Sequence, residues 1–223
     1  MVYQINFKQN VFIESLILTA IIFIVGFSIG YYVENFRTDK IVQDYKQYEV
    51  EALDLKLQNY YYQIMSKSSC EEAIKQNFVF ADQLYDTGLT LEKYEEANQI
   101  SGALLVEKKR YVLLKTELWL NSLLLKAKCN AQFDTVVYFY SSDPSNSAKV
   151  AQQKIISNVL KTVKENHGNK MILLPIAGDL NLNSVKLQMN VYNVTNLPSI
   201  LIDEDIVLEG FSTSEDVEKY LIY

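Results

Sequence analysis

The sequence is poor in the residues on which most catalytic and metal sites depend. Its 223 residues contain one histidine, His167, and two cysteines, Cys70 and Cys129. A single histidine excludes histidine-pair metal sites and most histidine-based catalysis. Two cysteines are too few for a disulfide-rich scaffold but sufficient for one bridge. No cofactor and no metal site is predicted.

Glycine and proline are also scarce, with 7 and 3 residues. Long helices with few interruptions are therefore expected, and an all-β fold is disfavoured. The formal net charge is -6, and the sequence has no clustered run of lysine and arginine. Proteins that bind nucleic acid need a concentrated basic surface, so this class of function is excluded.

One long apolar run lies near the N-terminus. Ser15–Val33 carries no charged residue and, at about 1.5 Å per residue, matches a hydrocarbon core about 30 Å thick. We expect residues 1–10 to be a tail and residues 11–33 an uncleaved transmembrane anchor in the lipid bilayer, because no small-residue cleavage site follows the run. The alternative is a buried core helix.

Gly26 and Gly30 form a G-x-x-x-G pair within this anchor. Glycines four residues apart share one helix face and allow two backbones to approach closely. The pair therefore suggests helix association, with a second copy or with another protein. The alternative is a chance occurrence of a spacing that is common in membrane helices.

Residues 34–130 are predicted to form a long juxtamembrane helix and a helical bundle. From Glu34 two apolar stripes at helical spacing suit a helix that packs on both sides, in a bundle or beside a partner chain. A helix from Cys70 is expected to end at Asp86-Thr87-Gly88, and a short helix follows from Thr90. A third covers Ala103–Lys128, with lysines in its last turn.

Cys70 lies at the start of one of these helices, and Cys129 just after the end of another that should run antiparallel to it. A bridge between them would close a loop of about 60 residues and contribute about 4 kcal/mol in the chain-entropy model. Disulfides persist in oxidising compartments, so the bridge favours an extracytoplasmic domain with the N-terminus inside. The alternative is two separate thiols in a cytosolic domain, which a simple count of flanking positive charges favours slightly.

Residues 131–223 change to alternating strands and helices. Strands are predicted at Thr135–Tyr140, Lys170–Ile176, Ser199–Asp203 and Ile206–Glu209, with helices at Ala148–Asn166, Leu182–Val191 and Thr213–Leu221. The order is β-α-β-α-β-β-α.

This part of the chain resembles a thioredoxin, and the resemblance is most specific at Tyr192–Ser199, YNVTNLPS. Thioredoxins have a tyrosine, a short loop, a hydrophobic residue and then a cis-proline before a buried strand. The resemblance implies an α/β thioredoxin-like fold with a cis bond between Leu197 and Pro198, and Gly210 matches a glycine after the last strand. The long helices and low glycine content are similar to those of small uncharacterised membrane-anchored proteins of archaea, which implies no function.

The sequence departs from the family at the redox site. Where thioredoxins carry Cys-x-x-Cys, this chain has Asp143-Pro144-Ser145-Asn146. Dithiol chemistry needs a thiolate and a resolving thiol, so the protein is not expected to be an oxidoreductase at this site. Asp143 is instead predicted to cap the following helix, with Pro144 at its first position.

The function implied by the resemblance is a redox-inactive binding or scaffolding module. In the family, the cis-proline loop and the neighbouring helix start bind extended polypeptide, which here implies a groove lined by Asp143, Ser145, Asn146, Leu197 and Pro198. Two alternatives stay open: a structural subunit of a membrane complex, assembled through the anchor and juxtamembrane helix with a protein partner or as a homodimer, and a thiol–disulfide enzyme that uses Cys70 and Cys129.

Three smaller features have modest predictions. His167 ends a helix and is expected to cap it or to interact with the helix dipole, not to act in catalysis. Asp203, Glu204 and Asp205 form an acidic turn that could suit a cation but is expected to be solvated. Asn193-Val194-Thr195 fits the pattern for N-glycosylation, or is a chance match.

Overall fold

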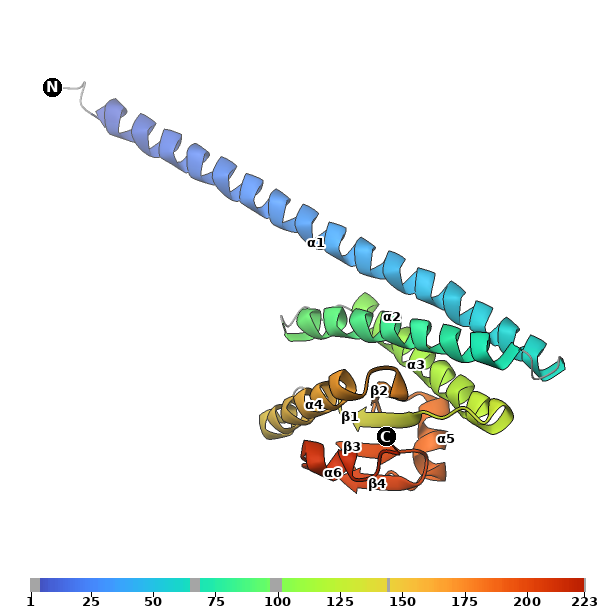
Figure 1. The fold of residues 1–223 in the computed structure, drawn as a ribbon. Coiled ribbons are helices and arrows are strands. Elements are labelled where there is room, and N and C mark those ends of the chain that lie inside the picture. Colours follow the sequence, from blue (N-terminus) through green and yellow to red (C-terminus); the bar gives the residue numbers. More distant parts are fainter. Residues whose placement is uncertain (1–4, 65–68, 97–101, 144, 223) are drawn as a thin grey trace. The chain divides into compact units, whose positions relative to one another are not determined.

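The structure is a computed structural model and describes residues 5–64, 69–96, 102–143 and 145–222. Contacts divide the chain into two compact units, Met1–Asp44 and Tyr45–Tyr223. The first helix, α1 (Ile5–Ile64), begins within the segment predicted to be a tail and continues without interruption past the apolar run (Figure 1). The absence of proline from this stretch explains its continuity.

Within α1, the segment Phe12–Asn35 is long and apolar enough to cross a membrane, and none of its residues is buried in the protein. A signal sequence near an N-terminus passes the same test of length and composition. The serine and threonine hydroxyls in this segment are satisfied within the helix, since Ser15 Oγ donates to Phe12 O (3.0 Å), Thr19 Oγ1 to Ser15 O (2.8 Å) and Ser28 Oγ to Ile24 O (2.7 Å). Such internal bonds are what an apolar environment requires of polar groups.

Two antiparallel helices follow, α2 (Cys70–Glu96) and α3 (Gly102–Cys129). The expected break at Asp86-Thr87-Gly88 is wrong, because α2 continues through it and includes the short helix predicted from Thr90. Gly88 serves a different purpose: a Cβ there would collide with the hydroxyl of Tyr111 on α3. That hydroxyl donates to Leu84 O (2.5 Å), so the glycine allows close approach of the two helices.

The remaining elements form a mixed sheet with helices on both faces. Its strands are β1 (Asp134–Tyr140), β2 (Met171–Ala177), β3 (Ser199–Ile202) and β4 (Ile206–Glu209), in the order β2-β1-β3-β4. β1 and β2 are parallel, whereas β3 is antiparallel to β1 and to β4. The helices are α4 (Ser147–His167), α5 (Asn183–Val191) and α6 (Ser214–Glu218), all close to the predicted ranges.

Each face of the sheet has its own core. On one face, β1, β2 and β3 pack against α4 and α6 through the buried residues Val136, Tyr138, Met171, Ile200, Ile156, Leu160, Val163 and Val217. On the other face, Trp119 of α3 packs edge-on against Phe139 of β1, with ring centroids 6.0 Å apart. Figure 1 shows α4 and α6 on one side of the strands and α5 on the other. α3 therefore packs directly on the sheet, although it precedes residues 130–131, where the sequence changes from helices alone to alternating strands and helices.

Candidate functional site

The sheet topology brings three loops to one end of the sheet. Tyr140 is opposite Ala177 in the parallel pair, and Phe139 is opposite Ser199 in the antiparallel pair. The loop after β1, the turn after β2 and the loop before β3 therefore meet at the carboxyl ends of β1 and β2. This is the edge at which open α/β sheets bind ligands.

Asp179 ties the first two of these loops together. Its carboxylate accepts hydrogen bonds from Ser141 Oγ (2.6 Å), from Ser142 Oγ (2.7 Å) and from Ser142 N (2.9 Å). Burial alone raises the pKa of Asp179, but these hydrogen bonds outweigh it and hold the pKa below its usual value. Asp179 was not among the residues predicted from the sequence. Its position directly after a parallel strand was the signal that could have found it.

The loop after β1 is also held from α4. Gln153 Oε1 accepts from Ser141 N (2.7 Å), and Gln153 Nε2 donates to Ser141 O (3.0 Å). Because both ends of one amide side chain engage the same backbone residue, the loop leaves the sheet in a fixed direction.

The prediction that Asp143 caps α4 is wrong. The N-cap is Asn146, whose Oδ1 accepts from Lys149 N (3.0 Å), and α4 begins at Ser147. Asp143 instead accepts from Ser145 N (2.9 Å) and Ser145 Oγ (2.8 Å), and these bonds lower its pKa. The prediction for Pro144 lies outside the described residues. Asp143, Ser145 and Asn146 are all exposed at this end of the sheet.

The third loop contains the cis peptide bond between Leu197 and Pro198, which confirms the prediction from the sequence. Leu197 packs beneath the turn after β2, since a Cβ at Gly178 would lie 3.1 Å from Leu197 Cδ2. The next residue is paired, because Gly210 N donates to Pro198 O (3.1 Å). The N–H and C=O of Leu197, by contrast, have no hydrogen-bond partner in the part of the chain that the structure describes.

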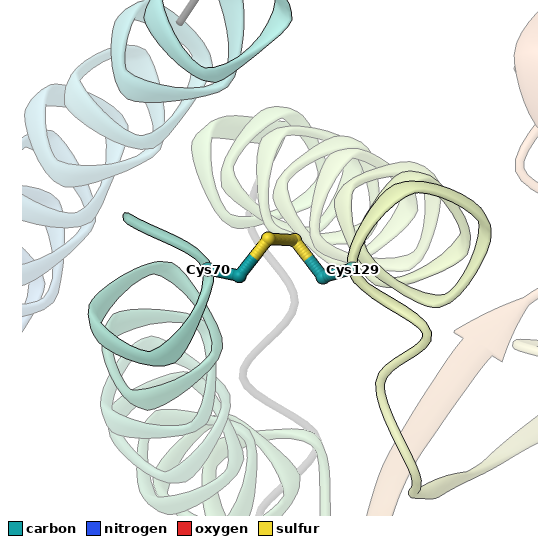
Figure 2. Close-up of a disulfide and its surroundings, with 2 residues drawn as sticks. All are labelled: Cys70 and Cys129. Carbon is teal, nitrogen blue, oxygen red and sulfur yellow. A yellow bond between two sulfur atoms is a disulfide. The ribbon is translucent and has the colours of Figure 1, made fainter. Parts of the chain in front are cut away.

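The two cysteines lie elsewhere. Cys70, at the start of α2, and Cys129, at the end of α3, form a disulfide with Cα atoms 5.6 Å apart (Figure 2). This confirms the predicted pairing and excludes two separate thiols. Cys129 follows Lys126, whose Nζ lies 3.2 Å from Thr135 Oγ1 at the beginning of β1. The disulfide is therefore at the end of the sheet opposite the three loops.

That opposite end holds a cluster of charged side chains, which we name the carboxylate cluster: Asp134, Asp203, Glu204 and Lys126. Lys126 Nζ lies 2.6 Å from Asp203 Oδ1, and Trp119 Nε1 donates to Glu204 Oε1 (2.6 Å). The expectation that the turn is simply solvated is therefore wrong for Asp203 and Glu204. Both have positive φ angles, of 48° and 60°, and their side chains contact Trp119 and Lys126 of α3 and Thr135 of β1.

The pKa values of the two aspartates in this cluster are shifted in opposite directions. Burial raises the pKa of Asp134 to about 6; the N–H of Ile222, which donates to its carboxylate, opposes this shift, and the neighbouring Asp203 adds to it. Burial also acts on Asp203, but Lys126 and the N–H of Thr135 hold its pKa below the usual value. At neutral pH the cluster therefore keeps the buried carboxylate of Asp134 beside the half-buried carboxylate of Asp203, with Lys126 as the neighbouring cation.

The remaining predicted residues have simple environments. His167 Nδ1 lies 2.9 Å from Val163 O in the last turn of α4, and Gly168, with φ 52°, ends that helix. A Cβ added at Gly26 or Gly30 would meet no atom of the described residues within 4 Å, so the role of these glycines in helix association stays a prediction.

Comparison with known proteins gives a distant likeness. No model of a known protein family matches the chain, and no curated protein does. Among solved structures, the crystal structure of chloroplastic thioredoxin z is similar to 44% of this chain and 83% of its own, with 18% sequence identity and a TM-score of 0.32. That crystal structure defines a type-specific target recognition for thioredoxin z. The chain thus has a helical N-terminal region and a mixed α/β domain with distant similarity to a thioredoxin.

Proposed function

We propose that the protein is a single-pass membrane-anchored binding or scaffolding protein, with a redox-inactive thioredoxin-like domain outside the cytoplasm. Its binding site is a groove at the exposed Asp143, Ser145 and Asn146 and the half-buried Leu197, with the adjacent Pro198 buried, and its ligand is an extended polypeptide segment. The observation that carries this proposal is the unpaired backbone of Leu197 at the sheet end where the loops meet.

An unpaired N–H and C=O on a half-buried residue offer the two bonds with which an extended peptide adds to the edge of a sheet. Leu197 is held in place by its packing near Gly178, and the facing loop is held by Asp179 and Gln153. A site fixed in this way loses little conformational entropy on binding. Serine and asparagine side chains at its rim supply further donors and acceptors.

Redox inactivity is supported by the chemistry of the groove. Asp143, Ser145 and Asn146 carry no thiol, and both cysteines are joined in the disulfide at the far end of the sheet. The same disulfide supports an oxidising compartment, and the apolar segment Phe12–Asn35 supports a membrane anchor. Together they favour an N-in, C-out topology.

Binding to a randomised library of nine-residue peptides, measured with the full chain in nanodiscs, tests the groove. Ser145→Trp is expected to weaken binding about tenfold or more, or about 1.4 kcal/mol, because the indole would fill the rim. The matched control is Thr162→Trp, at an exposed position of α4 about 22 Å further along the helix. Peptides with alternate backbone nitrogens methylated should also bind weakly, since they lack the N–H that pairs with Leu197. Equal loss in both tryptophan variants, or full binding by the methylated peptides, would refute the groove.

A second candidate function is a structural subunit of a membrane complex. It is favoured by a stripe on α1, formed by Val50, Leu53, Leu57 and Tyr60, in which every side chain is more than half exposed. Their 3-4-3 spacing is that of a helix seam that packs against another helix. If this stripe makes the principal contact, Leu53→Glu with Leu57→Glu will release the protein from a larger assembly on native gels of mild detergent extracts, whereas Ser145→Trp will not.

A further inference from the structure

We propose that Asn193 is a site of N-linked glycosylation, whose donor is a lipid-linked saccharide. The inference rests on the proposed extracytoplasmic position of the domain. Asn193 is the only asparagine in the chain that is followed by a non-proline residue and then by serine or threonine. That arrangement is the acceptor pattern for the modification.

The fold leaves Asn193 accessible. It follows the end of α5 in a turn, its side chain is exposed, and its φ angle is 57°. Within the described residues its side-chain amide makes no hydrogen bond, and only its backbone N–H is used, toward Asn190 O (3.3 Å). A saccharide on Nδ2 would therefore replace no contact of the folded domain.

The residues on either side of Asn193 pack against the domain. Val194 is 4% exposed, and its N–H donates to Met189 O (2.8 Å). On the other side, Tyr192 packs against Trp119, with ring centroids 5.4 Å apart. Because both neighbours are anchored to the domain, the glycan would project into solvent from a fixed point.

The folded geometry also implies an order for saccharide transfer and folding. Thr195 Oγ1 is engaged with Glu209 Oε1 (3.2 Å), and Val194 is buried, so the acceptor tripeptide is not presented as a flexible segment once the domain has folded. Transfer therefore precedes folding of this segment. A bond forms between Asn193 Nδ2 and the anomeric carbon of the saccharide, the bond from that carbon to the lipid phosphate breaks, and the amide nitrogen loses one proton. No electron transfer is involved.

The test uses the full chain made in a host that glycosylates its exported proteins, with the tryptic peptide of residues 187–219 analysed by mass spectrometry. The wild-type peptide should carry a saccharide mass on Asn193. Asn193→Gln and Thr195→Ala should lose it completely, while Thr195→Ser should keep it, because serine preserves both the acceptor pattern and the hydroxyl that reaches Glu209. The disulfide and its accessibility from outside are assayed on the same cells, by labelling with a membrane-impermeant thiol reagent with and without prior reduction.

The two assays separate this inference from the proposed topology. A chain that is bridged and externally accessible but carries no saccharide on Asn193 overturns the glycosylation alone. A chain with free thiols that is protected from external reagents overturns the extracytoplasmic topology and the glycosylation with it. A saccharide that persists in Asn193→Gln would place the modification at another residue and also overturn the inference.

Discussion

Replacement of Asp134 by asparagine should stabilise the protein at neutral pH. Asp134 is fully buried, and its pKa is raised from 3.8 to about 6 by burial, with Asp203 adding to the effect. A shift of this size corresponds to a free-energy difference of about 3 kcal/mol between the two protonation states, which is an upper value for the gain. The amide of asparagine can still accept from Ile222 N–H and can donate to Asp203, as a protonated carboxyl would.

The sign follows from linkage. Because the folded state favours the protonated form of Asp134, this group makes the free energy of unfolding fall as the pH rises from about 3.8 through about 6. Asp203 and Asp179 act in the opposite sense, since their pKa values are lowered, and their contribution is lost only as the pH falls below about 4. Asp134→Asn should therefore gain most stability at pH 7 and about a third as much at pH 4.5.

Trp119 provides the assay, since it is the only tryptophan in the chain and is fully buried against the sheet. Its fluorescence during urea titration of the full chain in detergent reports unfolding of the domain. The control is Asp205→Asn. Asp205 is exposed in the turn between β3 and β4 that contains Asp203, and its replacement should change the free energy of unfolding by less than about 0.5 kcal/mol. The reasoning fails if Asp134→Asn lowers the stability at pH 7, or if its gain is the same at pH 4.5 and pH 7.

Three further changes test the fold by the same fluorescence assay. Removal of the disulfide by Cys70→Ser with Cys129→Ser should lower the free energy of unfolding by up to about 4 kcal/mol, because the bridge spans 59 residues. A cooperative unfolding transition should still be seen. An unchanged free energy of unfolding would show that the bridge does not form. Gly88→Ala should cost about 1–3 kcal/mol, because the new Cβ meets the hydroxyl of a tyrosine on α3, and a stabilising effect would contradict the helix contact. Asn146→Ala should cost about 1 kcal/mol through loss of the α4 cap, whereas Asp143→Ala should cost less than about 0.5 kcal/mol; the reverse order would restore Asp143 as the cap.

The elements that the sequence predicted well are those with local or repetitive signals. The uncharged run in α1 and the alternation of strands and helices after Cys129 each depend on patterns within a short window. The disulfide followed from two helix ends and an antiparallel connection. Leu197–Pro198 came from a family resemblance and from no physical property of the nearby residues.

The errors have long-range causes. Gly88 looks like the end of a helix, but it is required by the approach of Tyr111, a residue 23 positions away. Asp203 looks like a solvated turn residue, but Lys126, which is 77 positions away, pairs with it. No local window contains these partners, so only the tertiary structure identifies them.

The candidate site shows the same contrast between local signals and long-range partners. Asp143, Ser145 and Asn146 lie in the segment after β1, where the family resemblance implied a groove, and their role in such a groove stays a prediction; the capping role was assigned to the wrong residue. The two N-caps differ by three residues, and both aspartate and asparagine are favourable cap residues, so the local sequence does not decide between them. Asp179 was missed because its role is to bond two serines 37 and 38 residues away.

We propose an external domain with a stable bridge and no redox chemistry. It is tested most directly by labelling intact cells with a membrane-impermeant thiol reagent, with and without prior reduction, followed by intact mass measurement. We predict that Cys70 and Cys129 are labelled only after reduction. Labelling only after cell lysis, without reduction, would place the domain in the cytoplasm, and ready labelling of intact cells without reduction would contradict a stable, redox-inactive bridge.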